Sequence, residues 1–224
     1  MEVLKTFRHE YKYVISYDEM LKIRSKLDKL LSVDRSETGY MIRSLYFDSL
    51  NDNDYYDKLG GEYQRKKIRL RIYDLKSNKV KLEIKQKIDY HQLKESLVID
   101  KKDALKIMKE NYKPLLKYKD ELAKRLYVIL KEGNYKPKVV IEYHRIAYTT
   151  GTTTRITFDF DIKKSDNYKM FFSKDINYIN LSDIPEVVLE VKFDRFLEPY
   201  IGDILSKYNK RYQSVSKYVI GRNI

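Results

Sequence analysis

The stretch KKIRLRIYDLKSNKVKLEIKQKI, residues 66–88, decides the fold class, because it alternates apolar and charged side chains on both sides of a short polar turn. In its first half, Ile68, Leu70 and Ile72 occupy every second position, with arginines between them. The second half repeats the alternation with lysines and a glutamate between the apolar residues. This period of two predicts two β-strands, each with one apolar and one charged face. Residues 74–78, Asp-Leu-Lys-Ser-Asn, can form the turn between them.

The same alternation recurs along most of the chain, in segments rich in Ile, Val, Tyr and Phe. The candidate strands lie near residues 8–16, 40–48, 66–74, 79–88, 92–100, 137–149, 153–163 and 187–195. Helical spacing of apolar residues occurs at 17–32, 102–110, 118–132 and 199–208. We therefore predict one α+β domain over residues 1–224, in which an eight-stranded antiparallel sheet closes into a barrel with flanking helices.

Composition narrows the classes of partner. The 46 Lys and Arg exceed the 33 Asp and Glu, which gives a formal net charge of +13. This excess favours an anionic partner, such as nucleic acid, an acidic membrane surface or a phosphate-rich small molecule. No stretch has the apolar length of a membrane span, and the N-terminus lacks the apolar core of a signal peptide. We therefore expect a cytoplasmic protein without a membrane span.

Several kinds of site are excluded or disfavoured. The sequence has no cysteine, so disulfides, thiolate zinc sites and cysteine nucleophiles are excluded. It has no GxxxxGK[ST] segment, so phosphate is not held by a P-loop. His9, His91 and His144 do not have the spacing of metal ligands, so we expect structural or exposed roles for them.

The charged faces of the strands are unusual. One face of an antiparallel sheet is often wetted, so a polar face alone is not informative. Here, however, arginines gather on these faces together with carboxylates, and Arg is suited to bidentate contact with phosphate oxygens. If the sheet closes, these faces line a tunnel. The predicted lining has the cations Arg8, Lys12, Arg69, Arg71, Lys81, Lys85, Arg145, Arg155, Lys192 and Lys217, and the carboxylates Glu10, Glu83, Asp159 and Glu190.

Such a tunnel holds more positive than negative charge. Enclosed charge of one sign is costly unless it is solvated or compensated. The lining therefore suits several linked phosphates, and its carboxylates could hold a hard divalent cation through oxygen ligands.

Eight short motifs occur in an order that resembles a known family. They are RHEYKY at 8–13, SLYFD at 44–48, RLR at 69–71, EIK at 83–85, YHRIAY at 143–148, RITFD at 155–159, EVK at 190–192 and SVSKY at 214–218. Together they resemble the VTC (vacuolar transporter chaperone) polyphosphate polymerase domain, which belongs with the CYTH proteins to the triphosphate tunnel metalloenzymes. Arg8 stands where the CYTH pattern E-x-E-x-K has its first Glu, and this favours the VTC branch.

The resemblance implies roles for particular residues. The residues expected to grip phosphates during catalysis are Lys12, Arg69, Arg71, Lys85, Arg145, Arg155 and Lys217. Further substrate-binding residues are expected at Arg8, Lys81, Tyr143, Lys192, Ser214 and Ser216. The resemblance also implies Mn²⁺ or Mg²⁺, with Glu190 as the principal ligand and Glu10, Glu83 or Asp159 as helpers.

The implied activity is that of a metal-dependent polyphosphate polymerase, which transfers the γ-phosphate of ATP to a growing polyphosphate chain. A tripolyphosphatase or nucleoside triphosphatase in the same tunnel stays open, because water or a phosphate end can attack the same centre. A non-catalytic polyphosphate-binding module also stays open. The basic, tyrosine-containing segment 207–212 could attract RNA, but we expect no specific nucleic-acid partner, since bases do not enter a tunnel sized for phosphates. The expected partners are ATP, triphosphate and polyphosphate.

Overall fold

The computed structural model describes residues 8–89, 91–151, 154–208, 210–212 and 215–223. The chain forms two compact units, each assembled from segments that are distant in the sequence. Unit 1 comprises residues 1–41, 143–162 and 182–216, and unit 2 comprises residues 42–142, 163–181 and 217–224. The expectation of one domain over the whole chain stays a prediction.

All eight predicted strands are present within a few residues of their expected positions. They are β1 (Arg8–Ser16), β3 (Tyr40–Asp48), β4 (Gln64–Ile72), β5 (Lys79–Ile88), β6 (His91–Asp100), β7 (Lys136–Thr149), β8 (Arg155–Ser165) and β10 (Glu186–Asp194). Three further strands have two residues each: β2 (Ser32–Val33), β9 (Ile179–Asn180) and β11 (Arg211–Tyr212).

The four predicted helices are also present. They are α1 (Tyr17–Leu27), α3 (Lys101–Ile107), α4 (Glu121–Glu132) and α5 (Pro199–Ser206). The sequence analysis did not predict four other helical segments: α2 (Asn53–Leu59), α6 (Lys217–Asn223) and the 3₁₀ helices η1 (Lys113–Lys117) and η2 (Tyr168–Met170). None of the helices in the described ranges is long and apolar enough to cross a membrane.

The prediction of a closed eight-stranded barrel is not confirmed. Within the described residues, eleven strands form an open sheet in the hydrogen-bonded order β11-β1-β10-β8-β7-β3-β4-β5-β6, with β2 on β7 and β9 on β8. The short strand β11 pairs with β1, where Tyr212 lies opposite Tyr13 and Arg211 opposite Val14. What is confirmed is an α+β fold on a mostly antiparallel sheet.

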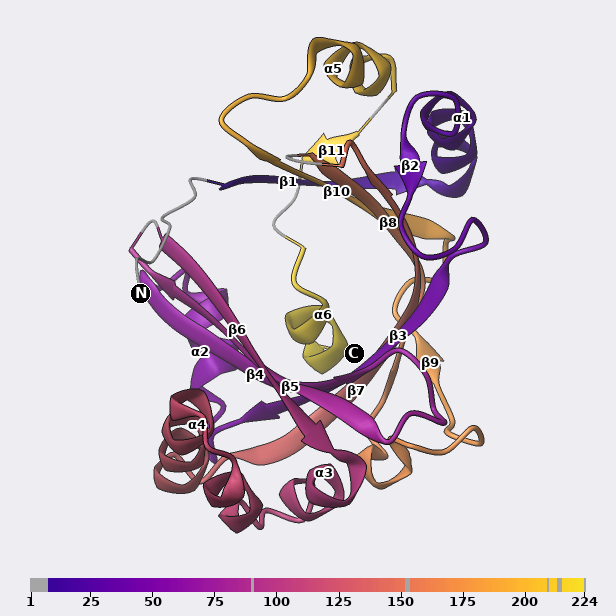
Figure 1. The fold of residues 1–224 in the computed structure, drawn as a ribbon. Coiled ribbons are helices and arrows are strands. Elements are labelled where there is room, and N and C mark those ends of the chain that lie inside the picture. The colour runs from indigo at the N-terminus through magenta and orange to yellow at the C-terminus, as the bar shows by residue number, and fades with distance from the viewer. Residues whose placement is uncertain (1–7, 90, 152–153, 209, 213–214, 224) are drawn as a thin grey trace. The chain divides into compact units, whose positions relative to one another are not determined.

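Unit 1 buries the apolar faces of β1, β8 and β10 against helices α1 and α5 (Figure 1). Helix α1 begins at a capping box, in which the side chain of Ser16 accepts from the backbone N–H of Glu19 and the Glu19 carboxylate accepts from the backbone N–H of Ser16. Its stripe of Met20, Ile23 and Leu27 is fully buried. The opposite face of these strands therefore carries the charged residues of the alternating pattern.

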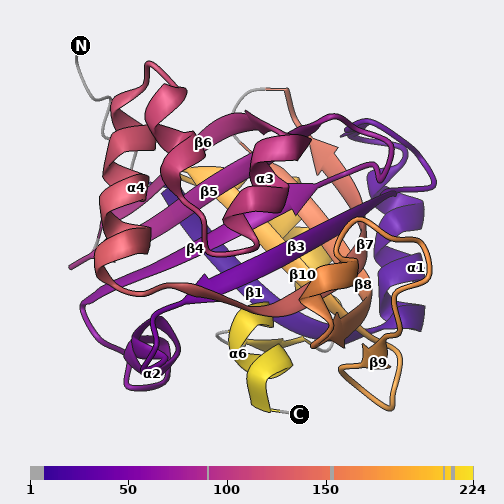
Figure 2. The ribbon, with the colours of Figure 1, turned by 90° about the horizontal axis from the view of Figure 1, so that it is seen from below.

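Unit 2 buries the apolar faces of β3, β4 and β5 under helices α3 and α4, which lie across the sheet in Figure 2. Helix α6 packs on the opposite, charged face of the same sheet. Its Tyr218 stacks on Tyr46 of β3 with ring centroids 5.1 Å apart. Gly221 lies so close to Ile141 of β7 that a Cβ at this position would collide with it. The fold thus places a short C-terminal helix beside the charged residues of β3 and β4.

Candidate functional site

In unit 1, the strand register brings two lysines and two glutamates together. Lys12 of β1 lies opposite Glu190 of β10, and Glu10 lies opposite Lys192. The Lys12 Nζ atom is 3.2 Å from Glu10 Oε1 and 3.5 Å from Glu190 Oε1. The Lys192 Nζ atom is 3.5 Å from Glu10 Oε1 and 3.0 Å from Glu190 Oε2. We call this group the four-residue charge ring.

The environment of the ring holds Lys12 in its charged form. Burial lowers the pKa of Lys12, but the negative charges of Glu190 and Glu10 outweigh burial, so the pKa of Lys12 is raised above its ordinary value. The Glu190 side chain is only 9% exposed. A buried carboxylate of this kind needs cationic partners in the folded protein, because an uncompensated buried charge is costly.

A second element of the same face is the pair of Arg145 on β7 and Asp159 on β8. The Arg145 Nε atom donates to Asp159 Oδ1 at 2.6 Å, and Nη2 donates to Oδ2 at 2.7 Å, which makes a bidentate contact. Burial lowers the pKa of Arg145, but Asp159 outweighs it and the pKa is raised well above its ordinary value. The guanidinium also lies 5.5 Å from the ring centroid of Tyr143.

Arg155 extends this face along β8, because it lies opposite Lys192 of β10. Its Nη2 atom donates to Asp34 Oδ2 at 2.7 Å and to the Tyr40 hydroxyl at 3.3 Å. The sequence analysis did not assign Asp34 or Tyr40 to the site. Asp34 lies in the loop before β3, so strand alternation could not connect it to Arg155, whereas Tyr40 is the first residue of β3.

In unit 2, Glu83 of β5 is the centre of the charged face. Arg69 Nε and Nη2 each lie 2.8 Å from Glu83 Oε2, and Arg71 Nη1 lies 3.6 Å from the same oxygen. Lys94 Nζ of β6 lies 2.8 Å from Oε1. Burial raises the pKa of Glu83, but Arg69, Arg71 and Lys94 outweigh burial and hold its pKa at about 2. Glu83 is therefore a buried counter-ion shared by three cations.

Lys94 was missed by the sequence analysis, although the strand pattern held a signal for it. Lys94 lies directly opposite Lys85 across the β5–β6 ladder, and Ser96 lies opposite Glu83. Once the register is known, Lys94 must project to the same side as the predicted residues Lys85 and Glu83.

Strand β3 adds two polar groups to this face. Arg71 Nε donates to Ser44 Oγ at 3.3 Å, and Arg69 Nη1 donates to the Tyr46 hydroxyl at 3.0 Å. Burial raises the pKa of Tyr46, but Arg69, Arg71 and, to a smaller extent, Lys217 lower it below its ordinary value. Lys217, the first residue of α6, therefore lies near the same face as the two arginines.

The remaining predicted residues are placed as follows. Lys81 of β5 has its Nζ atom 5.5 Å from the ring centroid of Tyr73. Ser216 is buried and immediately precedes α6. Ser214 and the side chain of Arg8 lie outside the described residues.

The acidic residues predicted to bind metal fall into separate groups. Glu10 and Glu190 lie together in the charge ring, Asp159 has both oxygens bound by Arg145, and Glu83 belongs to unit 2. In the part of the chain that the structure describes, no three Asp, Glu or His side chains gather as a ready metal site. Mg²⁺ is often held by only one or two carboxylates plus substrate phosphates, so the Glu10 and Glu190 pair fits such an ion.

A family model shows the family of the chain, and solved structures show its similarity in fold. The family model of the VTC domain matches residues 7–224. No curated protein sequence matches the chain. Among solved structures, the protein HpAC1 from Hippeastrum, a proposed adenylyl cyclase with a dominant triphosphatase activity, has 15% identity and a TM-score of 0.57, over 96% of this chain and 94% of that chain. The PH1819 protein from Pyrococcus horikoshii OT3 has 11% identity and a TM-score of 0.48, over 96% and 97% of the two chains.

Proposed function

The chain belongs to the VTC family, and from this premise we propose that it is a metal-dependent enzyme that transfers the γ-phosphate of ATP to a growing polyphosphate chain. One observation carries the proposal: arginines and lysines from several strands gather on sheet faces around a few buried carboxylates. This arrangement supplies many donors for phosphate oxygens and few competing acceptors.

The balance of charge favours an anionic ligand most clearly in unit 2. Its face carries the cations Arg69, Arg71, Lys81, Lys85 and Lys94, and the carboxylate Glu83. Arginine binds phosphate oxygens through paired N–H groups, and such charge-assisted contacts are roughly twice as strong as neutral ones. A bound triphosphate would supply the negative charge that Glu83 alone does not.

The face in unit 1 has the groups that phosphoryl transfer requires. In our proposal Glu190, helped by Glu10, holds Mg²⁺ or Mn²⁺, which when bound neutralises charge on phosphate oxygens. Lys12 and Lys192 lie on both sides of these carboxylates and donate to the same phosphate oxygens. Arg145, held in place by Asp159, offers its guanidinium edge to a further phosphate. Phosphoryl transfer depends mainly on such positioning and neutralisation.

Hydrolysis of triphosphate is the second candidate, and one specific observation favours it. HpAC1, which shares the fold at a TM-score of 0.57, has a dominant triphosphatase activity. In that case water, rather than the end of a phosphate chain, attacks the γ-phosphorus. The same residues then bind the same substrate, and only the acceptor differs.

The experiment that separates these candidates uses the purified full chain. With ATP and Mn²⁺, a polymerase produces a ladder of polyphosphate chains on a gel. A hydrolase instead releases free phosphate from ATP or tripolyphosphate and produces no ladder. A binding module binds polyphosphate without turnover, and that binding survives Glu190→Ala.

Two arginine variants make the test specific to the charged faces. Arg71→Ala should abolish tripolyphosphate binding while leaving the fold intact. The matched control is Arg125→Ala, because Arg125 is about half exposed and pairs with Glu95 on the outer surface of unit 2. Equal tripolyphosphate binding by Arg71→Ala and wild type would refute the phosphate-binding role of this face.

A further inference from the structure

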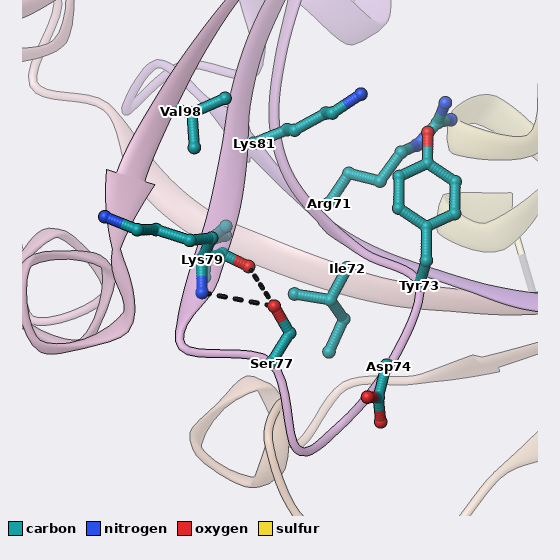
Figure 3. Close-up of a pocket in the computed structure, with 9 residues that line it drawn as sticks. Arg71, Ile72, Tyr73, Asp74, Ser77, Lys79, Lys81 and Val98 are labelled. Atoms are coloured by element: carbon teal, nitrogen blue, oxygen red, sulfur yellow. Dashed lines mark hydrogen bonds between the residues drawn. The ribbon is translucent and has the colours of Figure 1, made fainter.

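A pocket of about 290 Å³ lies in unit 2 at the turn that joins β4 to β5, beyond the arginines of the charged face (Figure 3). Its walls include Arg71, Tyr73, Lys81 and Val98, and its outer rim includes Asp74 and Ser77. We propose that this pocket binds the nucleoside of a nucleoside triphosphate. The inference rests on the proposed function, which it deepens by distinguishing nucleotides from inorganic triphosphate as substrates.

The pocket begins where the phosphate-binding face ends. Arg69, Arg71 and Tyr73 occupy alternate positions along β4 and its end, so they project to the same side. Since a strand rises about 3.3 Å per residue, the two arginines are spaced roughly 7 Å apart along it. A triphosphate bound along the arginines would therefore have its next group beside Tyr73. In an inorganic triphosphate no such group exists.

The walls of the pocket suit a flat heterocycle. Figure 3 shows the Tyr73 ring on one side and Val98 on the other side of the β4–β5 hairpin. Burial raises the pKa of the Tyr73 hydroxyl, but the nearby cations Arg71 and Lys81 outweigh burial and lower it, so this end of the ring faces positive charge. Val98 is 51% exposed, so its apolar surface is available to a ligand. Aromatic rings stack on bases of any sequence, because every base has a π face.

The polar groups differ between the two ends of the pocket. Arg71 and Lys81 lie at the end that adjoins the charged face, while Asp74 and Ser77 lie at the other end (Figure 3). Lys79 lines this other end with its backbone, which bonds Ser77 Oγ at 3.0 and 3.1 Å. Its ammonium group instead pairs with Asp100 at 2.7 Å. A phosphate at this end would meet the Asp74 carboxylate, whereas ribose hydroxyls and base amino groups can donate to it.

The test measures binding of two probes by isothermal titration calorimetry: adenylyl imidodiphosphate, which carries a nucleoside, and inorganic tripolyphosphate, which does not. Tyr73→Ala should weaken binding of adenylyl imidodiphosphate about tenfold, because a stacking wall is lost, and should leave the Kd of tripolyphosphate unchanged. Val98→Trp should have the same selective effect by filling the pocket. Tyr73→Phe keeps the ring and should bind adenylyl imidodiphosphate as the wild type does.

The control is Tyr63→Ala, since Tyr63 is 64% exposed and does not line the pocket. Equal Kd values of wild type and both pocket variants for adenylyl imidodiphosphate would overturn the inference. Equal weakening of both probes would also overturn it, because the pocket would then act only through Arg71. If the wild-type protein binds neither probe, the proposed function itself fails, and this outcome needs no variant to recognise.

Discussion

Replacing Glu83 with glutamine tests whether this buried carboxylate substitutes for a phosphate in the ligand-free protein. The substitution keeps the shape of the side chain and removes its charge. Arg69, Arg71 and Lys94 would then lie close together without their shared counter-ion. We expect the ligand-free Glu83→Gln variant to be less stable than the wild type, and to bind tripolyphosphate more tightly.

The pKa of Glu83 sets the size of the effect. Its pKa falls from an ordinary 4.5 to about 2 in the folded protein, which corresponds to about 3 kcal/mol of stabilisation at 1.36 kcal/mol for each unit. Because the folded pKa is the lower one, this stabilisation is fully present above pH 4.5 and is lost as the pH falls through 2. At pH 7 the variant should therefore unfold roughly 6–12 °C below the wild type, at about 2–4 °C per kcal/mol for a chain of this length.

Thermal unfolding with and without tripolyphosphate measures both parts of the prediction. A ligand that replaces the missing negative charge should raise the melting temperature of Glu83→Gln more than that of the wild type. Glu110→Gln is the control, because Glu110 is about half exposed and lies 3.8 Å from Lys136, a surface pair worth about 0–1 kcal/mol. Equal melting temperatures of Glu83→Gln and wild type would refute the counter-ion role. So would an equal rise in the melting temperature of both proteins when tripolyphosphate is added.

Three further predictions concern groups that the structure buries. Arg145→Ala leaves the fully buried Asp159 without its bidentate partner and should lower the free energy of unfolding by about 3–5 kcal/mol. Urea titrations measure this change, and a loss under 1 kcal/mol would contradict the prediction. Burial raises the pKa of Asp54 from 3.8 to about 6, so the free energy of unfolding of the wild type should fall by about 3 kcal/mol as the pH rises from 4 to above 6. Asp54→Asn should remove this pH dependence, and an equal slope of unfolding free energy against pH in both proteins would count against the prediction. Tyr218→Phe removes the hydroxyl that donates to the buried Asp48, so it should cost about 1–3 kcal/mol and speed amide hydrogen exchange in α6, an effect that should be absent in Tyr56→Phe.

The strands could be predicted from the sequence because their period of two is enforced by burial. Ile68, Leu70 and Ile72, chosen by alternation alone, are each at most 1% exposed. The two missed α-helices lack such a signal. Helix α2 has seven residues, and the Asp52 that precedes it has a left-handed backbone, with φ of 56°, and no capping side chain. Helix α6 is equally short and depends on contacts with Tyr46 and Ile141, which are far away in the sequence.

The sequence could predict which residues lie on the charged faces, but not which of them contact each other. Alternation places Glu83 and Arg69 on charged faces, but only the β4–β5 register sets them opposite each other. Lys94 required the β5–β6 register, and the contact of Asp34 with Arg155 required the path of a loop. For the same reason the sequence could not show that Asp159 has both oxygens bound by Arg145. The roles of these residues in binding and catalysis stay predictions.

The division of each unit into three separated stretches of chain affects how the protein is made. Unit 1 contains residues 1–41 and also residues 182–216. The hydrogen bonds between β1 and β10 therefore cannot form until β10 has been synthesised. Pairings over such long sequence separations close large loops before they gain contacts, which slows folding. During that wait β1 has an unpaired edge on the ribosome, where it is open to chaperones and to aggregation. A truncation before residue 186 removes β10 and should therefore leave the nascent N-terminal strand without its partner.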